Sequence, residues 1–383
     1  MSKSGAQHGS LWKLFTYFFR LSWTGFGGPL AYIAMMEDDC VEKRRWLGKE
    51  EFAEMLGITN MLPGPNATEM AIHIGYVKGG KLGAVLSGLA FTIPSFIIMV
   101  VLSWLYFQYG SMPTASGIFY GINPVVVGVI IVTALRLGRV SVVDWKLAAI
   151  CIVAVLLSYL TAINEALILL GAGLAGIIIY GPALKRGLPA ALLFLQTSIP
   201  TLLDFERLPI QLQLFLEFLK GGLLMFGTGL VIIPLLAPDV VDFFGWMSYK
   251  EFFDGVTLGQ ITPGPVMKTA AFVGYKVAGI CGAAAAMAGI FLPPFIIVTL
   301  LAPFFRQMRK NPWLQGFLKG VKAGAVGVIL AVVPSLGKVA FPDLLTVAIC
   351  LLGMLAMVKA KVNVSVLVLV AGAFGIVMKL MHF

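Results

Sequence analysis

Two stretches decide the fold of this chain: Leu62-Pro63-Gly64-Pro65-Asn66 and, 200 positions later (263 − 63), Thr262-Pro263-Gly264-Pro265-Val266. A glycine-rich stretch precedes each one. It reads Phe26-Gly27-Gly28-Pro29-Leu30 in the first half and Phe226-Gly227-Thr228-Gly229-Leu230 in the second. The spacing between the two kinds of stretch is the same in both halves. The chain therefore contains an internal repeat, and in an apolar protein such a repeat is typical of secondary transporters.

Composition places the chain in a membrane. Hydrophobic residues make up 59% of it and charged residues 12%, whereas about a quarter of a soluble domain is charged. Apolar runs such as 85–107 and 117–135 approach the ~20 residues that a spanning helix needs. The first apolar segment contains Arg20, which the apolar core of a signal peptide would not. We expect an all-α polytopic membrane protein without a soluble domain.

The formal net charge of +10 does not indicate nucleic-acid binding, because the basic residues are spread over many short loops and form no patch. This distribution is instead typical of positive-inside loops. The four cysteines have no paired or metal-ligand spacing, and no HExxH or Walker motif is visible. We therefore expect no metal, no cofactor, no nucleic-acid partner and no enzymatic activity.

Loop charges predict how the halves lie in the bilayer. The loop 136–146 has three basic residues and its counterpart 335–343 has only Lys338, whereas 108–116 has none and its counterpart 303–312 has three. Basic residues thus change sides between matching loops, which predicts an inverted-topology repeat. We expect an N-terminal repeat over 11–187, a linker over 188–211 that itself crosses the membrane, and a C-terminal repeat over 212–381.

The Pro-Gly-Pro stretches must interrupt helices, because proline removes a backbone donor and clashes with the preceding turn. In hydrocarbon, the freed backbone groups must face protein or water. A new helix that starts after each break would direct unpaired N–H groups and a partial positive charge inward, as an anion site does. A single such break would favour a structural kink. Two at matched positions favour discontinuous or re-entrant helices around a binding site.

The candidate substrate-binding residues belong to the breaks and to the turns after them: Gly27, Gly28, Pro63, Gly64, Pro65, Asn66, Thr68, Gly227, Thr228, Gly229, Pro263, Gly264, Pro265 and Lys268. The candidates for coupling or gating are Arg20, Arg45, Glu69 and His73. Lysine and glutamate at membrane depth are usually functional. Lys268 would balance the charge of an anion, and Glu69 would carry a proton or pair with Lys268. The alternatives are a snorkelling Arg20 and a packed, neutral His73.

Several of these motifs together resemble a known family: Phe26-Gly27-Gly28-Pro29, Lys43-Arg44-Arg45-Trp46, Leu62-Pro63-Gly64-Pro65-Asn66-Ala67, Ile74-Gly75-Tyr76, and Gly79-Gly80 with Gly83. This series resembles the chromate ion transporter family, in its long form with two repeats.

The resemblance implies a carrier in a bacterial inner membrane that exports chromate, a tetrahedral dianion shaped like sulfate, with the proton motive force. It implies the oxyanion and the lipid bilayer as partners, and we also expect a homodimer. The second half departs from the motif at Thr228 and Val266, so an asymmetric site is expected. Sulfate, molybdate or another oxyanion is an alternative substrate, and an anion channel is an alternative mechanism.

Overall fold

The computed structural model describes residues 4–25, 29–110, 112–161, 163–181, 207–225, 229–301, 304 and 311–381. The described residues are almost entirely helical and include no strand. Five of the described helices are long and apolar enough to cross a membrane. The chain is thus an all-α polytopic membrane protein, as expected. The predictions for Gly27, Gly28, Gly227 and Thr228, and for most of the linker, lie outside the described residues.

The two halves contain the same series of elements. The first has α1 (Ser4–Thr24), α2 (Pro29–Glu37), the π-helix η1 (Asp38–Lys43), α3 (Lys49–Thr59), α4 (Asn66–Tyr109), α5 (Pro113–Ser141), α6 (Trp145–Leu160) and α7 (Glu165–Tyr180). The second has α8 (Ile210–Leu224), η6 (Gly229–Val231), α9 (Ile232–Ala237), η7 (Pro238–Phe243), α10 (Tyr249–Ile261), η8 (Val266–Lys268), α11 (Thr269–Leu301), α13 (Pro312–Ala340), α14 (Leu344–Val358) and α15 (Val364–Met381). The opposed orientation of the halves in the bilayer stays a prediction.

The helices end and begin where the Pro-Gly-Pro stretches predict. In the first half α3 ends at Thr59 and α4 begins at Asn66. In the second half α10 ends at Ile261, but the α-helix resumes only at Thr269, after the short 3₁₀ turn η8. The tighter turn is visible in its hydrogen bonding, since the Lys268 N–H donates to the Pro265 carbonyl three residues back, at 3.3 Å.

A second interruption, which the hydropathy pattern does not reveal, lies inside α4 and α11. Gly80 (φ 62°) and Gly279 (φ 60°) have left-handed backbone conformations that favour glycine. A side chain at Gly83 would meet the carbonyl of Gly75, although residues eight apart lie about 12 Å apart along a straight helix. Each of these helices is therefore a tight hairpin made of a short arm, a reversal and a long arm.

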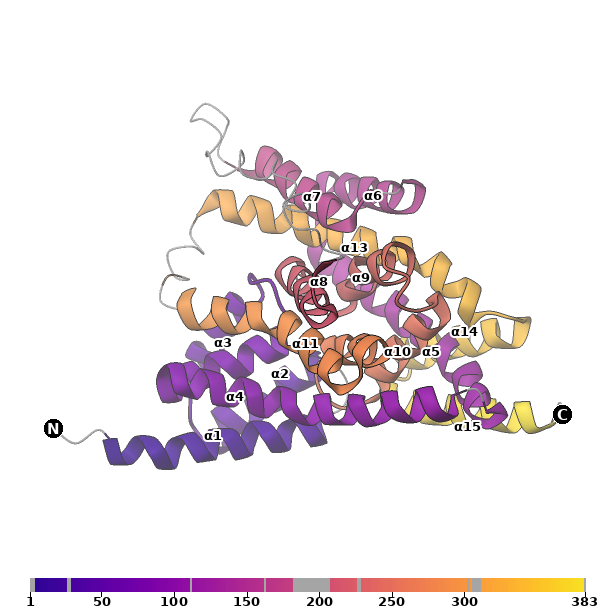
Figure 1. The fold of residues 1–383 in the computed structure, drawn as a ribbon. Helices are drawn as coiled ribbons and strands as arrows, with labels where there is room; N and C mark the ends of the chain where they lie inside the picture. Colours follow the sequence, from indigo (N-terminus) through magenta and orange to yellow (C-terminus); the bar gives the residue numbers. More distant parts are fainter. Residues whose placement is uncertain are drawn as a thin grey trace.

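Helices of each half pack against helices of the other half. α5 of the first half packs on α14 and α15 of the second, and α13 of the second half packs on α6 and α7 of the first. Small residues allow this contact, because Gly176 meets Gly316 and Gly320 while the equivalent Gly375 meets Gly117 and Gly121. In Figure 1, α8, α9 and α10 lie in the middle of the molecule, with α1 and α4 on one side and α6 and α7 on the other.

Candidate anion site at the helix breaks

The backbone of each Pro-Gly-Pro stretch bonds to the other half of the chain. The Gly64 N–H donates to the carbonyl of Met225, the residue that follows α8, at 2.7 Å. The Gly264 N–H donates to the Tyr32 hydroxyl at 2.5 Å, and that hydroxyl donates to the carbonyl of Gly25, the residue that follows α1, at 2.5 Å. Gly25 and Met225 are equivalent positions of the repeat. Each Pro-Gly-Pro break is therefore linked to the end of the first helix of the opposite half, and these two linked breaks define a buried centre.

The long arms of the opposite halves close this centre. A side chain at Gly64 would lie 3.3 Å from Cβ of Pro294 in α11, and one at Gly264 would clash with Ser95 in α4. Ser95 and Pro294 are again equivalent positions. The backbone at Gly64 (φ 145°) and Gly264 (φ 101°) also requires glycine. Close packing and backbone conformation together explain why both breaks have glycine between the prolines.

Lys268 is fully buried one turn beyond the second break. Its ammonium donates to the carbonyls of Thr262 (2.8 Å), Pro263 (2.7 Å) and Gly264 (3.4 Å). These carbonyls follow the C-terminal end of α10, where a cation is favoured by the helix dipole. The second break therefore contains a fully buried lysine whose amine, within the described part of the chain, donates to backbone carbonyls.

Glu69 follows Thr68, which is the repeat counterpart of Lys268 in the first half. Its side chain is fully buried, and its Oε1 lies 2.7 Å from the position that a Cβ on Gly64 would take. Neither carboxylate oxygen has a hydrogen-bond partner in the described part of the chain, and the same holds for the Thr68 hydroxyl and for Nδ1 of His73. The structure thus contains no ion pair between Glu69 and Lys268. Buried polar groups without partners are rare and require an explanation.

Asn66 connects the two helices that flank the first break. Its amide donates to Oδ1 of Asn60, while its own Oδ1 is buried without a partner among the described residues. The second half has Gln260 and Val266 at these positions, so this bond has no counterpart there. The centre is therefore asymmetric in its side chains.

Two of the predicted coupling residues are not at this centre. Arg20 is an exposed residue of α1, and its counterpart Lys220 pairs instead with Glu217 (2.8 Å) and Asp239 (2.7 Å). Arg45 is exposed in the loop before α3, where its positive φ of 50° matches the φ of 59° at Gly245. Gly229 is buried in η6, next to the second glycine-rich stretch.

Sequence reasoning missed two residues that organise the centre. Tyr32 bridges two breaks, and no sequence pattern marks it. Asp254 is fully buried in α10 and accepts hydrogen bonds from Tyr106 (2.8 Å) and Asn123 (2.9 Å), besides an ion pair with Lys250 (2.6 Å). It joins α10 to α4 and α5 of the other half. The sequence signal for Asp254 was the presence of an acidic residue inside the apolar segment before the second break.

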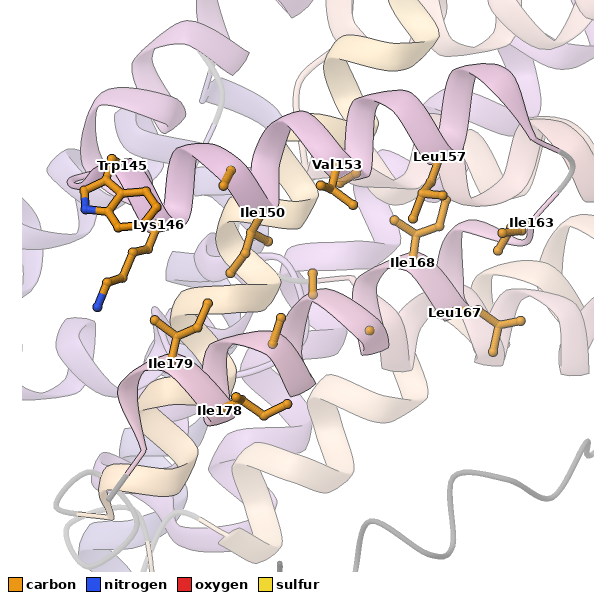
Figure 2. Close-up of a pocket in the computed structure, with 15 residues that line it drawn as sticks. Trp145, Lys146, Ile150, Val153, Leu157, Ile163, Leu167, Ile168, Ile178 and Ile179 are labelled. Atoms are coloured by element: carbon orange, nitrogen blue, oxygen red, sulfur yellow. The ribbon is translucent and has the colours of Figure 1, made fainter. Parts of the chain in front are cut away.

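A surface groove in the described structure lies away from this chemistry. Figure 2 shows an apolar groove of about 840 Å³ between α6 and α7, with Trp145 and Lys146 at one end and Leu167 at the other. Its lining is apolar apart from Lys146, and Leu167 is 59% exposed. Such a surface suits lipid acyl chains and lacks the polar groups that an anion needs. The described residues also contain no group of three or more metal-binding side chains.

The apolar helices and the buried polar centre define a polytopic helical membrane protein with discontinuous helices. The sequence profile of the family described as Chromate transporter matches residues 12–177 and 212–376. The chain therefore belongs to the chromate transporter family.

Curated relatives agree with this assignment over nearly their whole length. The chain is 35% identical to the "Probable chromate transport protein" of Synechococcus elongatus, covering 96% of this chain and 95% of the relative. It is 36% identical to the "Chromate transport protein" of Cupriavidus metallidurans, with 95% and 92% covered. It is 33% identical to the "Chromate transport protein" of Pseudomonas aeruginosa, with 95% and 91% covered. No solved structure matches the chain.

Proposed function

We propose that this protein is a secondary transporter of a tetrahedral oxyanion that exports chromate across a bacterial inner membrane. The observation that supports the proposal best is the linkage of each Pro-Gly-Pro break to the opposite half, in a family with curated members that are named for chromate transport. Broken helices at the interface of two repeats are where secondary transporters bind ions and substrates.

The chemistry of the centre suits a small dianion. Lys268 supplies a buried positive charge beside the second break, and Thr68 and Asn66 supply polar atoms beside the first. The N–H groups at the start of α4, beginning with Asn66, have no preceding helical turn whose carbonyls could accept their hydrogen bonds. We assign the substrate to this centre, together with the glycine-rich stretches around Gly27 and Gly227.

The membrane potential alone is sufficient to drive export. Each negative charge that leaves a cell with a negative interior gains about 2.3 kcal/mol per 100 mV, so a dianion gains about 4.6 kcal/mol. That corresponds to a concentration ratio on the order of 10³. The proton motive force thus supplies enough energy for efflux without ATP. Sulfate or another oxyanion is the alternative substrate, and an anion channel is the alternative mechanism.

The test uses the purified full-length chain in proteoliposomes. Vesicles loaded with unlabelled chromate should take up labelled chromate against its gradient, because a carrier exchanges substrate and a channel does not. Adding sulfate outside should leave this counterflow unchanged if the site prefers chromate. Uptake no faster than in protein-free vesicles would reject chromate transport, and fast uptake without counterflow would favour the channel. Cross-linking in the same vesicles would test the homodimer.

A further inference from the structure

The Glu69 carboxylate is buried without a hydrogen-bond partner among the described residues, and the transport of an anion does not by itself explain why an acid lies there. A fully buried carboxylate without a partner among the described residues is destabilising by several kcal/mol if it is ionised. It is also a negative group in the place where a negative substrate is expected to bind. Either feature alone would be selected against in an anion site, unless the group takes part in the transport cycle.

The position of the carboxylate is specific. Glu69 lies in the first turn of α4, and its side chain folds back so that Oε1 lies over Gly64 of the break. Pro294 of α11 contacts the same glycine from the other half. The carboxylate therefore lies at the N-terminal end of a half-helix, where the dipole favours an anion. A substrate oxyanion at the first break would need the same space.

No charged neighbour fixes the protonation state of Glu69. On the helices packed against α4, the buried titratable side chains among the described residues are Tyr17 on α1, Tyr32 on α2, Asp254 on α10 and Lys268 on η8, besides His73 on α4 itself. None of them forms a hydrogen bond with the Glu69 carboxylate. Lys268 in particular directs its ammonium at the backbone carbonyls of the second break. The protonation of Glu69 is therefore free to respond to whatever anion lies beside it.

We propose that the Glu69 carboxylate is a tethered anion that competes with the transported oxyanion for the N-terminal end of α4. When the dianion binds, the carboxylate takes up one proton from solution and leaves the position, and when the dianion departs, the carboxylic acid releases that proton and returns. Binding of proton and oxyanion then favour each other by the same factor. This inference rests on the proposed function. Proton and dianion then cross the membrane together with one net negative charge, whose export the membrane potential favours by about 2.3 kcal/mol per 100 mV.

The test is chromate binding to the purified full-length protein by equilibrium dialysis, from about pH 6 to about pH 9, with Glu69→Gln beside the wild type. Chromate's own protonation is the same in both samples, so the ratio of the two affinities reports the protein alone. We expect the ratio to be near one at the acid end. At the alkaline end, Glu69→Gln should bind chromate about tenfold more tightly, because the competing charge is absent.

The matched control is Glu165→Gln. Glu165 is also a buried carboxylate in the first turn of a helix, but α7 follows no Pro-Gly-Pro break. This variant should bind like the wild type at every pH. A ratio for Glu69→Gln that does not change with pH, or weaker binding at every pH, would overturn the inference. Absence of binding by wild type and control alike would overturn the proposed function, and the inference with it.

A second measurement covers the case in which Glu69→Gln does not fold. Chromate added to weakly buffered wild-type protein at about pH 9, where chromate is a full dianion, should draw about one proton per bound chromate from solution. A pH electrode records this uptake directly. Binding without proton uptake would contradict the tethered-anion mechanism even though the chromate site itself is intact.

Discussion

Replacing Tyr32 by phenylalanine removes one hydroxyl that connects two helix breaks of opposite halves. In the wild type this hydroxyl accepts from the Gly264 N–H and donates to the Gly25 carbonyl, each at 2.5 Å and both buried. The substitution leaves two buried backbone groups without partners. Each such group is destabilising by about 1–3 kcal/mol, and part of this is offset because the hydroxyl no longer has to be buried. We expect the free energy of unfolding to fall by about 2–4 kcal/mol.

The assay is equilibrium unfolding of the purified protein in mixed micelles with increasing SDS. Tyr159→Phe is the control, because it removes the same hydroxyl from an exposed residue of α6 and should change the free energy by less than about 0.5 kcal/mol. The first Pro-Gly-Pro break has no such bridge, since the Gly64 N–H donates directly to the Met225 carbonyl. If Tyr32→Phe and Tyr159→Phe are equally stable, the bridge does not hold the breaks together and the reasoning fails.

Three further predictions concern charge, topology and packing. Lys268→Gln should weaken chromate binding about tenfold or more in equilibrium dialysis, because a buried charge is lost, while membrane insertion is unchanged; equal affinity would remove Lys268 from the site. Cysteines at Arg139 and Lys338 should react with an impermeant thiol reagent from opposite sides of the membrane, and labelling from one side would contradict the inverted repeat. Gly121→Ala should lower the free energy of unfolding by about 1–3 kcal/mol, because its methyl group meets a backbone carbonyl of α15, whereas Gly171→Ala, with open space around it, should be neutral.

The sequence predicted the elements that depend on local chemistry. Proline, glycine and proline in succession cannot continue a helix, so the breaks between α3 and α4 and after α10 follow from the Pro-Gly-Pro stretches. A single proline does not have this effect, because Pro94 lies inside α4. The reversals at Gly80 and Gly279 were not predicted, because apolar residues continue across them and a helical hairpin has the same hydropathy as a bent helix. The Gly79-Gly80 pair was the available signal.

The contacts between the halves could not be derived from sequence. The repeat predicts that the breaks approach each other, but not that Gly64 bonds to Met225 while Gly264 needs the hydroxyl of Tyr32. Such bonds depend on how two distant segments pack. The same is true of Lys268, whose charge was predicted to face an anion and whose ammonium donates to three backbone carbonyls. Local patterns indicate which residues are exceptional, and packing decides their partners.

The central claim is that an oxyanion binds at the buried centre that the two Pro-Gly-Pro breaks define. The most direct test is a crystal structure of the full-length protein with chromate, with data collected at a wavelength where chromium scatters anomalously. We predict an anomalous peak beside Gly64 and Gly264, within hydrogen-bond distance of the first residues of α4 or of Lys268. A chromium peak only in the groove between α6 and α7, or only at the exposed Arg45 loop, would contradict the account.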